Sequence, residues 1–377
     1  MKRHLLFLFA AFCASSLFAA EAPTITISKS DVIGISVSTI GGVDGAVVTK
    51  VLQEDLVRSG YFSIAPASSA GFIVSGASNG GSLDGKVVDH SGSSVVASTY
   101  SGTAASKAHA FADDIIKTIT GNKGFASTRI AFVATRTGRK EIYTADYNGS
   151  NVQQLTHDNS INVHPRLSPD GRKLVYTGYK SGYPDIYEVD LASGSRDRIV
   201  KFPGTNTGAA YSPDGHRIAA TLSKDGNPEL YVISGGAHRL THTPGVESSP
   251  TWSPDGDEII YSYDGSGAPL LYRISVGGGE GHEISTGHGY NTEPDWSPDG
   301  KKVTFNVRDG GFQIAVLDLQ SGSTKVVASG ENPVWGPDSR HILYAEGGAL
   351  YLLDAQTGKK AKVLDGLGKI TEPTWSR

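Results

Sequence analysis

Short runs of alternating apolar and polar residues recur through the last two-thirds of the chain. One run follows each of four Ser-Pro-Asp-Gly segments, which begin at residues 168, 212, 253 and 297, and another follows a decayed copy at residue 336. These runs cover residues 173–176, 217–220, 258–261, 302–305 and 341–344, and a further copy at 129–132 makes six. In each repeat two more runs follow, and the last one is shorter and more polar. Strand-length segments with a period of two, separated by turn residues, predict four antiparallel strands per repeat.

Four strands in about 40–45 residues are typical of one β-propeller blade. The first repeat lacks its first strand, and residues 371–376, Thr-Glu-Pro-Thr-Trp-Ser, supply such a strand after the last repeat. A ring closed in this way removes the open edges that a linear array would expose. We therefore predict a mainly β fold with a closed six-bladed propeller at residues 126–377; the alternative, an open solenoid, needs polar capping repeats. One repeat position holds all the tryptophans, which we interpret as packing between blades: Trp252, Trp296, Trp335 and Trp375.

Residues 21–125 lack the repeat and predict a small α/β domain. Apolar residues between Val47 and Leu56 indicate an amphipathic helix that ends at Gly60, and those between Ala108 and Ile119 indicate a second helix that stops at Gly121. Strands are expected at residues 24–27, 31–37, 72–75, 85–90 and 94–99.

The N-terminus has the pattern of a secretory signal peptide at residues 1–20. Lys2 and Arg3 precede an apolar stretch from Leu5 to Phe12, and small residues follow it. The mature chain is then expected to be exported, to lack cysteine, because Cys13 lies within the signal, and to insert no segment into a membrane. A net charge of −4 argues against a nucleic-acid partner.

No arrangement of residues predicts catalysis, a cofactor or a metal. Residues 76–80, Gly-Ala-Ser-Asn-Gly, match the G-x-S-x-G pattern of hydrolases, but turn residues follow where a nucleophile elbow needs a helix. A hairpin turn is the better interpretation. The sequence also contains no phosphate-binding loop, no dinucleotide fingerprint and no cysteine–histidine cluster.

Polar residues precede the first strand of every repeat. Four copies carry a glutamate at what we take to be one repeat position, and the other two carry a histidine or a polar triplet: Glu247, Glu293, Glu331, Glu372, His164 and Thr205-Asn206-Thr207. Equivalent propeller positions lie on a circle, so these residues predict an acidic rim at one channel mouth that attracts a basic partner segment or a cation. The alternative is that they are solvated loop residues.

The segment that joins the two regions carries a family resemblance. Residues 107–132, from the second predicted helix through Gly-Asn-Lys-Gly-Phe to Thr-Arg-Ile-Ala-Phe, resemble the corresponding join of the TolB family, and residues 48–62 are similar to its first long helix. The resemblance implies a non-enzymatic periplasmic propeller of the Tol–Pal system that supports outer-membrane integrity and cell division.

The resemblance also implies partners. Members bind the peptidoglycan-associated lipoprotein Pal on the propeller face, where the matching positions are Thr205, Asn206, Ser248, Ser249, Asn291, Thr292 and Glu293. Members engage the inner-membrane protein TolA through the segment after the signal peptide, which is short here. Two other functions stay open: an exported propeller that binds another peptide or a carbohydrate, and a propeller hydrolase or lyase.

Overall fold

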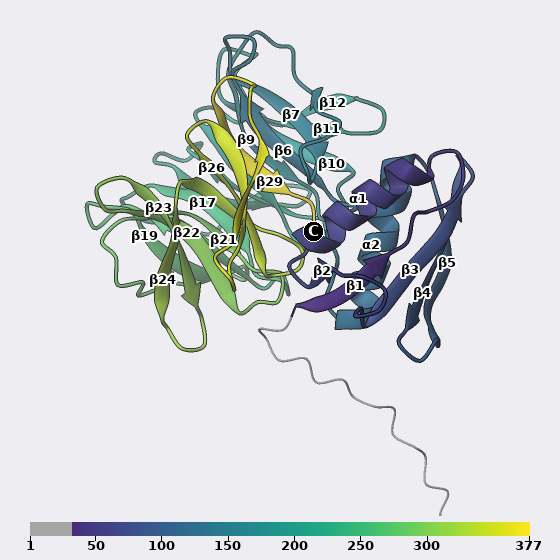
Figure 1. The fold of residues 1–377 in the computed structure, drawn as a ribbon. Coiled ribbons are helices and arrows are strands. Elements are labelled where there is room, and N and C mark those ends of the chain that lie inside the picture. Colours follow the sequence, from purple (N-terminus) through teal and green to yellow (C-terminus); the bar gives the residue numbers. More distant parts are fainter. Residues whose placement is uncertain (1–31) are drawn as a thin grey trace, which may run out of the picture.

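The computed structural model describes residues 32–377 and contains an N-terminal sheet with two helices beside a ring of six four-stranded sheets (Figure 1). The expected signal peptide at residues 1–20 and the expected strand at residues 24–27 lie outside the described residues. Neither helix in the described part of the chain is long and apolar enough to cross a membrane.

The N-terminal sheet has five strands in the order β2-β1-β3-β4-β5. Its strands are β1 (Ile33–Val37), β2 (Phe62–Ile64), β3 (Phe72–Ser78), β4 (Ser82–Asp89) and β5 (Ser94–Ser101). Strand β1 is parallel to both β2 and β3, and β3, β4 and β5 form an antiparallel meander. The G-x-S-x-G segment is the β3–β4 hairpin, in which the Asn79 amide donates to the Ser82 carbonyl at 2.9 Å, as predicted. The sequence pattern missed β2, which is only three residues long.

Two helices lie between this sheet and the propeller (Figure 1). They are α1 (Gly45–Arg58) and α2 (Ala104–Thr120). Helix α2 begins at Thr103, whose side chain accepts a hydrogen bond from the Ser106 amide, and ends at Gly121, whose φ of 73° is a conformation that glycine adopts without strain. The Phe111 ring of α2 packs directly over Gly85 in β4, where a Cβ atom would lie 2.8 Å from the ring, so glycine permits this close approach.

The remaining strands form the propeller, and we number its blades along the ring from the one that contains both ends of the repeat region. Blade 1 contains β29 (Ile370–Trp375), β6 (Arg129–Ala134), β7 (Glu141–Asp146) and β8 (Gln153–Gln154); blade 2 contains β9 (Asn162–Leu167), β10 (Lys173–Gly178), β11 (Asp185–Asp190) and β12 (Arg196–Val200). Blade 3 contains β13 (Asn206–Tyr211), β14 (Ile218–Leu222), β15 (Glu229–Ile233) and β16 (Ala237–Arg239); blade 4 contains β17 (Glu247–Trp252), β18 (Glu258–Tyr263), β19 (Leu270–Ser275) and β20 (His282–Glu283). Blade 5 contains β21 (Asn291–Trp296), β22 (Lys302–Arg308), β23 (Phe312–Asp318) and β24 (Thr324–Ser329); blade 6 contains β25 (Glu331–Trp335), β26 (His341–Glu346), β27 (Ala349–Asp354) and β28 (Lys360–Leu364).

The ring is closed as the sequence predicted. Strand β29 pairs with β6 in antiparallel register, with Trp375 opposite Ile130 and Ile370 opposite Ala134. This pairing joins the C-terminal strand to the three strands that follow the N-terminal region, and it rules out the open solenoid. The tryptophans are buried between blades, as expected: Trp252, for example, packs with Leu230 and Val232 of the preceding blade.

The N-terminal region and the propeller share one apolar core, which runs from Leu52 and Phe111 through Phe125 to Trp375. Buried polar contacts cross the same boundary. The Tyr147 hydroxyl, after β7, donates to Asp55 of α1 at 2.6 Å, and His109 of α2 lies 2.7 Å from the other oxygen of that carboxylate. The α/β region is therefore held on the propeller by specific contacts as well as by apolar packing.

Candidate functional site at the channel mouth

The first strand of every blade contains a β-bulge near its start, at the third residue in five blades and at the second residue of β25 in blade 6. The register with the second strand shifts at this point in all six blades. The bulged residues have φ between 51° and 64°: His164, Gly208, Ser249, Glu293, Asn332 and Glu372. A bulge bends the strand and re-aims its side chain. The six residues therefore form the repeat position that surrounds one mouth of the channel, which we call the bulge ring.

Hydrogen bonds connect five blades around the bulge ring. Thr207, next to Gly208 in blade 3, lies 3.2 Å from Nδ1 of His164 in blade 2. The His164 amide donates to Glu372 of blade 1 at 2.6 Å, and the Glu372 amide donates to the side-chain oxygen of Asn332 in blade 6 at 3.1 Å. The Asn332 side-chain amide in turn donates to Glu293 of blade 5 at 2.5 Å. These bonds hold the polar groups of the mouth in fixed directions before a partner arrives.

The channel is narrow at the bulge ring. The enclosed space there is about 20 Å³, which is room for about one water molecule.

The electrostatics of the bulge ring depend on Arg166, which lies next to it inside the channel. Burial raises the pKa of the Glu293 carboxyl, the charge of Arg166 opposes the shift, and the charge of Glu372 adds to it. Partial desolvation of the His164 imidazole lowers its pKa. The charge of Glu372 opposes this shift, and the charges of Arg166 and Lys140 strengthen it. The mouth thus combines a neutral histidine with two carboxyl groups.

The structure corrects the predicted acidic rim, because the four glutamates do not share one position. Only Glu293 and Glu372 belong to the bulge ring. Glu331 precedes the bulge of its blade by one residue and is half-buried, and Glu247 precedes its bulge by two residues and is fully buried. Burial and the neighbouring carboxylate of Glu229 raise the pKa of Glu247, so this side chain is a protonated group inside the blade and not a rim charge.

Two other expected contact residues stabilise loops. The Asn206 side chain is buried and donates to the carbonyl of Phe202 at 2.8 Å, and the buried Asn291 side chain donates to the carbonyl of His288 at 2.9 Å. The remaining expected positions are half-buried near the mouth and stay candidates: Thr205, Ser248, Ser249 and Thr292.

Sequence reasoning missed Asn332 and Arg166. A usable signal was present, because proline follows the bulged residue in five blades: Pro165, Pro250, Pro294, Pro333 and Pro373. Alignment of the repeats on this proline, instead of on the glutamates, would have placed Asn332 in the bulge ring. Within residues 32–377, no group of three acidic, histidine or cysteine side chains is arranged to hold a metal ion.

Comparison with known proteins identifies the family. Residues 116–377 match the family PD40, whose description is "TolB beta propeller domain". The chain belongs to this TolB family. A "Protein TolB homolog" from Chlorobaculum tepidum is 45% identical over 101 residues, which are 26% of this chain and 23% of that protein. A "Tol-Pal system protein TolB" from Geobacter sulfurreducens is 54% identical over 66 residues, 18% of this chain and 15% of that protein.

The aligned part therefore spans about a quarter or less of these curated TolB relatives. The crystal structure of TolB from Acinetobacter baumannii has the same fold, with a TM-score of 0.82 and 24% identity, covering 92% of this chain and 97% of that one. The family match covers the propeller region and names no hydrolase or lyase.

Proposed function

We propose that this TolB-family protein is a periplasmic adaptor of a Tol–Pal-type envelope complex. It binds a peptidoglycan-associated lipoprotein over the bulge ring and so supports outer-membrane integrity and cell division. The observation that carries the proposal is the family match together with a polar, pre-positioned ring around the channel mouth. A TolA-like inner-membrane protein is the second partner, through the segment that follows the expected signal peptide and lies outside the described residues.

The placement of the α/β region supports the bulge ring as the docking surface. This region contacts the propeller at Tyr147, Arg340 and Asp354, which lie at the opposite end of the strands from the bulges. The bulge-ring face is therefore free of the α/β region. Because its hydrogen bonds are already formed, a partner would bind with little ordering of the receptor side.

The charges of the bulge ring suggest the chemistry of the contact. Glu293 and Glu372 each accept a hydrogen bond on one carboxylate oxygen. The ammonium group of Lys140 lies 3.7 Å from Glu372, whereas Glu293 has no cation within 4 Å among the described residues. We expect the partner to present a basic or hydrogen-bond-donating side chain to these two carboxyl groups.

Calorimetric titration with the soluble domain of the organism's own peptidoglycan-associated lipoprotein tests the proposal. Glu293→Gln and Glu372→Gln should each weaken binding about tenfold, corresponding to about 1.4 kcal/mol, and should reduce the dependence of affinity on salt. The matched control is Glu280→Gln, an exposed glutamate in the β19–β20 loop, which should bind like the wild type. If the wild-type protein does not bind the lipoprotein, the proposed partner is wrong. If it binds and both bulge-ring variants bind equally well, the docking surface is wrong.

A further inference from the structure

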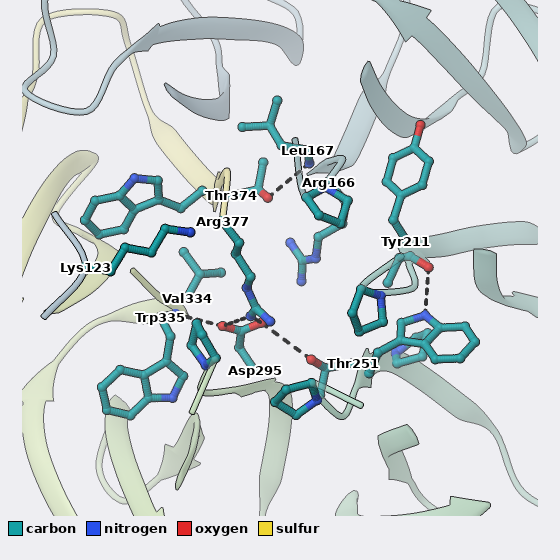
Figure 2. Close-up of a pocket in the computed structure, with 18 residues that line it drawn as sticks. Lys123, Arg166, Leu167, Tyr211, Thr251, Asp295, Val334, Trp335, Thr374 and Arg377 are labelled. Carbon is teal, nitrogen blue, oxygen red and sulfur yellow. Dashed lines mark hydrogen bonds and ion pairs between the residues drawn. The ribbon is translucent and has the colours of Figure 1, made fainter. Parts of the chain in front are cut away.

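The channel widens on the other side of Arg166 into a cavity of about 290 Å³ (Figure 2). The wall of this cavity includes the prolines of four Ser-Pro-Asp-Gly turns and the indole rings of Trp252, Trp335 and Trp375. The cavity is therefore at the end of the channel opposite the bulge ring, and its walls combine apolar rings with polar and charged groups. Its size suits a small molecule better than a folded partner.

Four charged side chains line the cavity: Lys123, Arg166, Asp295 and Arg377. Two of them neutralise one another, because the Arg377 guanidinium donates to both oxygens of Asp295, at 2.7 and 2.8 Å. The same carboxylate also accepts a hydrogen bond from the Trp335 amide at 2.7 Å. Asp295 is thus satisfied by its present partners and does not neutralise the other two cations.

Arg166 and Lys123 have no acidic partner of this kind. Within residues 32–377, neither forms an ion pair within 4 Å, and the hydrogen bond of the Arg166 guanidinium is to the carbonyl of the adjacent Pro165, at 3.3 Å. Figure 2 shows both cationic groups directed toward the space enclosed by the aromatic rings and the prolines. Two cations that form no ion pair within 4 Å and point into one cavity create a positive potential there, which attracts an anion.

We propose that this cavity binds a small organic dicarboxylate. The planar guanidinium of Arg166 suits bidentate binding of one carboxylate, and the ammonium of Lys123 provides a point charge for the second. The tryptophan and proline surfaces cover the short carbon chain between the two carboxylates. The site is separate from the bulge ring, and its existence does not depend on the proposed lipoprotein partner.

Glutarate is a suitable probe, and the full mature chain is titrated with it by calorimetry and by tryptophan fluorescence. Three of the chain's four tryptophans line the cavity, so binding should change the emission. Glutarate should bind with a dissociation constant in the millimolar range or below. Neutral glutaramide, which has the same length, should not bind, and acetate and inorganic phosphate should bind at least about tenfold more weakly, because each lacks the second carboxylate or the carbon chain.

Two variants locate the site. Arg166→Gln and Lys123→Gln should each weaken glutarate binding about tenfold or more. The matched control is Arg172→Gln, an arginine in the Ser-Pro-Asp-Gly turn of the same blade whose side chain is 84% exposed, and it should leave binding unchanged. Lys123 is exposed in the segment between α2 and β6, so its variant keeps the test valid even if Arg166→Gln unfolds.

Three results would overturn the proposal. If glutarate does not bind at 10 mM, or if it binds to the Lys123→Gln protein as tightly as to the wild type, the proposed site is wrong. Phosphate that binds as tightly as glutarate shows a general anion site and refutes the dicarboxylate assignment.

Discussion

Replacement of Trp375 by alanine tests whether the C-terminal strand holds the ring closed. The indole is 4% exposed, its nitrogen donates to the Thr128 hydroxyl at 2.6 Å, and its ring lies edge-on to Phe125 at 5.4 Å. It therefore joins strand β29 to the segment that enters blade 1 from the N-terminal region. This side chain thus packs across the junction between the two ends of the repeat region.

The expected magnitude follows from the buried area. A buried tryptophan removes roughly 150–250 Å² from water, and at about 25 cal/mol per Å² this area contributes about 4–6 kcal/mol. The alanine methyl group keeps part of that contribution, whereas the cavity and the lost hydrogen bond destabilise the protein further. We therefore expect Trp375→Ala to lower the free energy of unfolding by about 3–5 kcal/mol.

Urea unfolding, followed by both circular dichroism and fluorescence, measures this loss. The control is Val326→Ala on the outer strand β24, where the side chain is 39% exposed and the expected change is below about 0.5 kcal/mol. A loss below about 1 kcal/mol for Trp375→Ala would refute the reasoning, because the ring would then be closed by the backbone pairing of β29 alone.

Two further predictions concern the contact between the α/β region and the propeller. Tyr147→Phe should cost about 1–3 kcal/mol of stability, because it removes the 2.6 Å hydrogen bond to the buried Asp55 carboxylate; urea unfolding measures the cost, and limited proteolysis between α2 and β6 should become faster. Burial disfavours the charged form of His109, but the hydrogen bond and the charge of Asp55 outweigh it and raise the pKa of this histidine above 6.5. The stabilisation from protonated His109 is then complete below pH 6.5 and is lost as the pH rises through the folded-state pKa, so the stability advantage over His109→Asn should shrink as the pH rises above 6.5. The exposed His90→Asn is the control, and an advantage that grows with pH would contradict the assignment.

The two ends of the channel differ in chemistry. The bulge ring is narrow and presents carboxyl groups, whereas the other end is a wider cavity lined by Lys123, Arg166 and Arg377, and Arg166 lies between the two ends. A ligand in the cavity would change the surroundings of Arg166, whose charge acts on Glu293 in the bulge ring. Glutarate and the lipoprotein domain can therefore be titrated together, which measures any coupling between the two ends directly.

The number and spacing of the repeats in the sequence were sufficient to predict the architecture. Six apolar runs and a first strand displaced to the C-terminus predicted the number of blades and the addition of residues 371–376 to the first repeat, because a blade is built from local hairpins whose turns and alternation are visible in the chain. The same holds for α1 and α2, whose apolar faces and terminal glycines are local signals. The sequence pattern did not predict the edge strand β2, because a strand of three residues is too short to show a clear alternation of apolar and polar positions.

The candidate site needed the tertiary structure. One bulge in each first strand decides which residue turns into the channel, and a shift of one or two residues separates the half-buried carboxyl group of Glu293 at the mouth from the fully buried Glu247. Side chains of a strand alternate between faces, so spacing in the sequence cannot locate the bulge by itself. The contact of Asp55 with His109 and Tyr147, and the pairing of Arg377 with Asp295, join residues far apart in the chain. Only packing brings such groups together, because no local rule of strand or turn formation relates them.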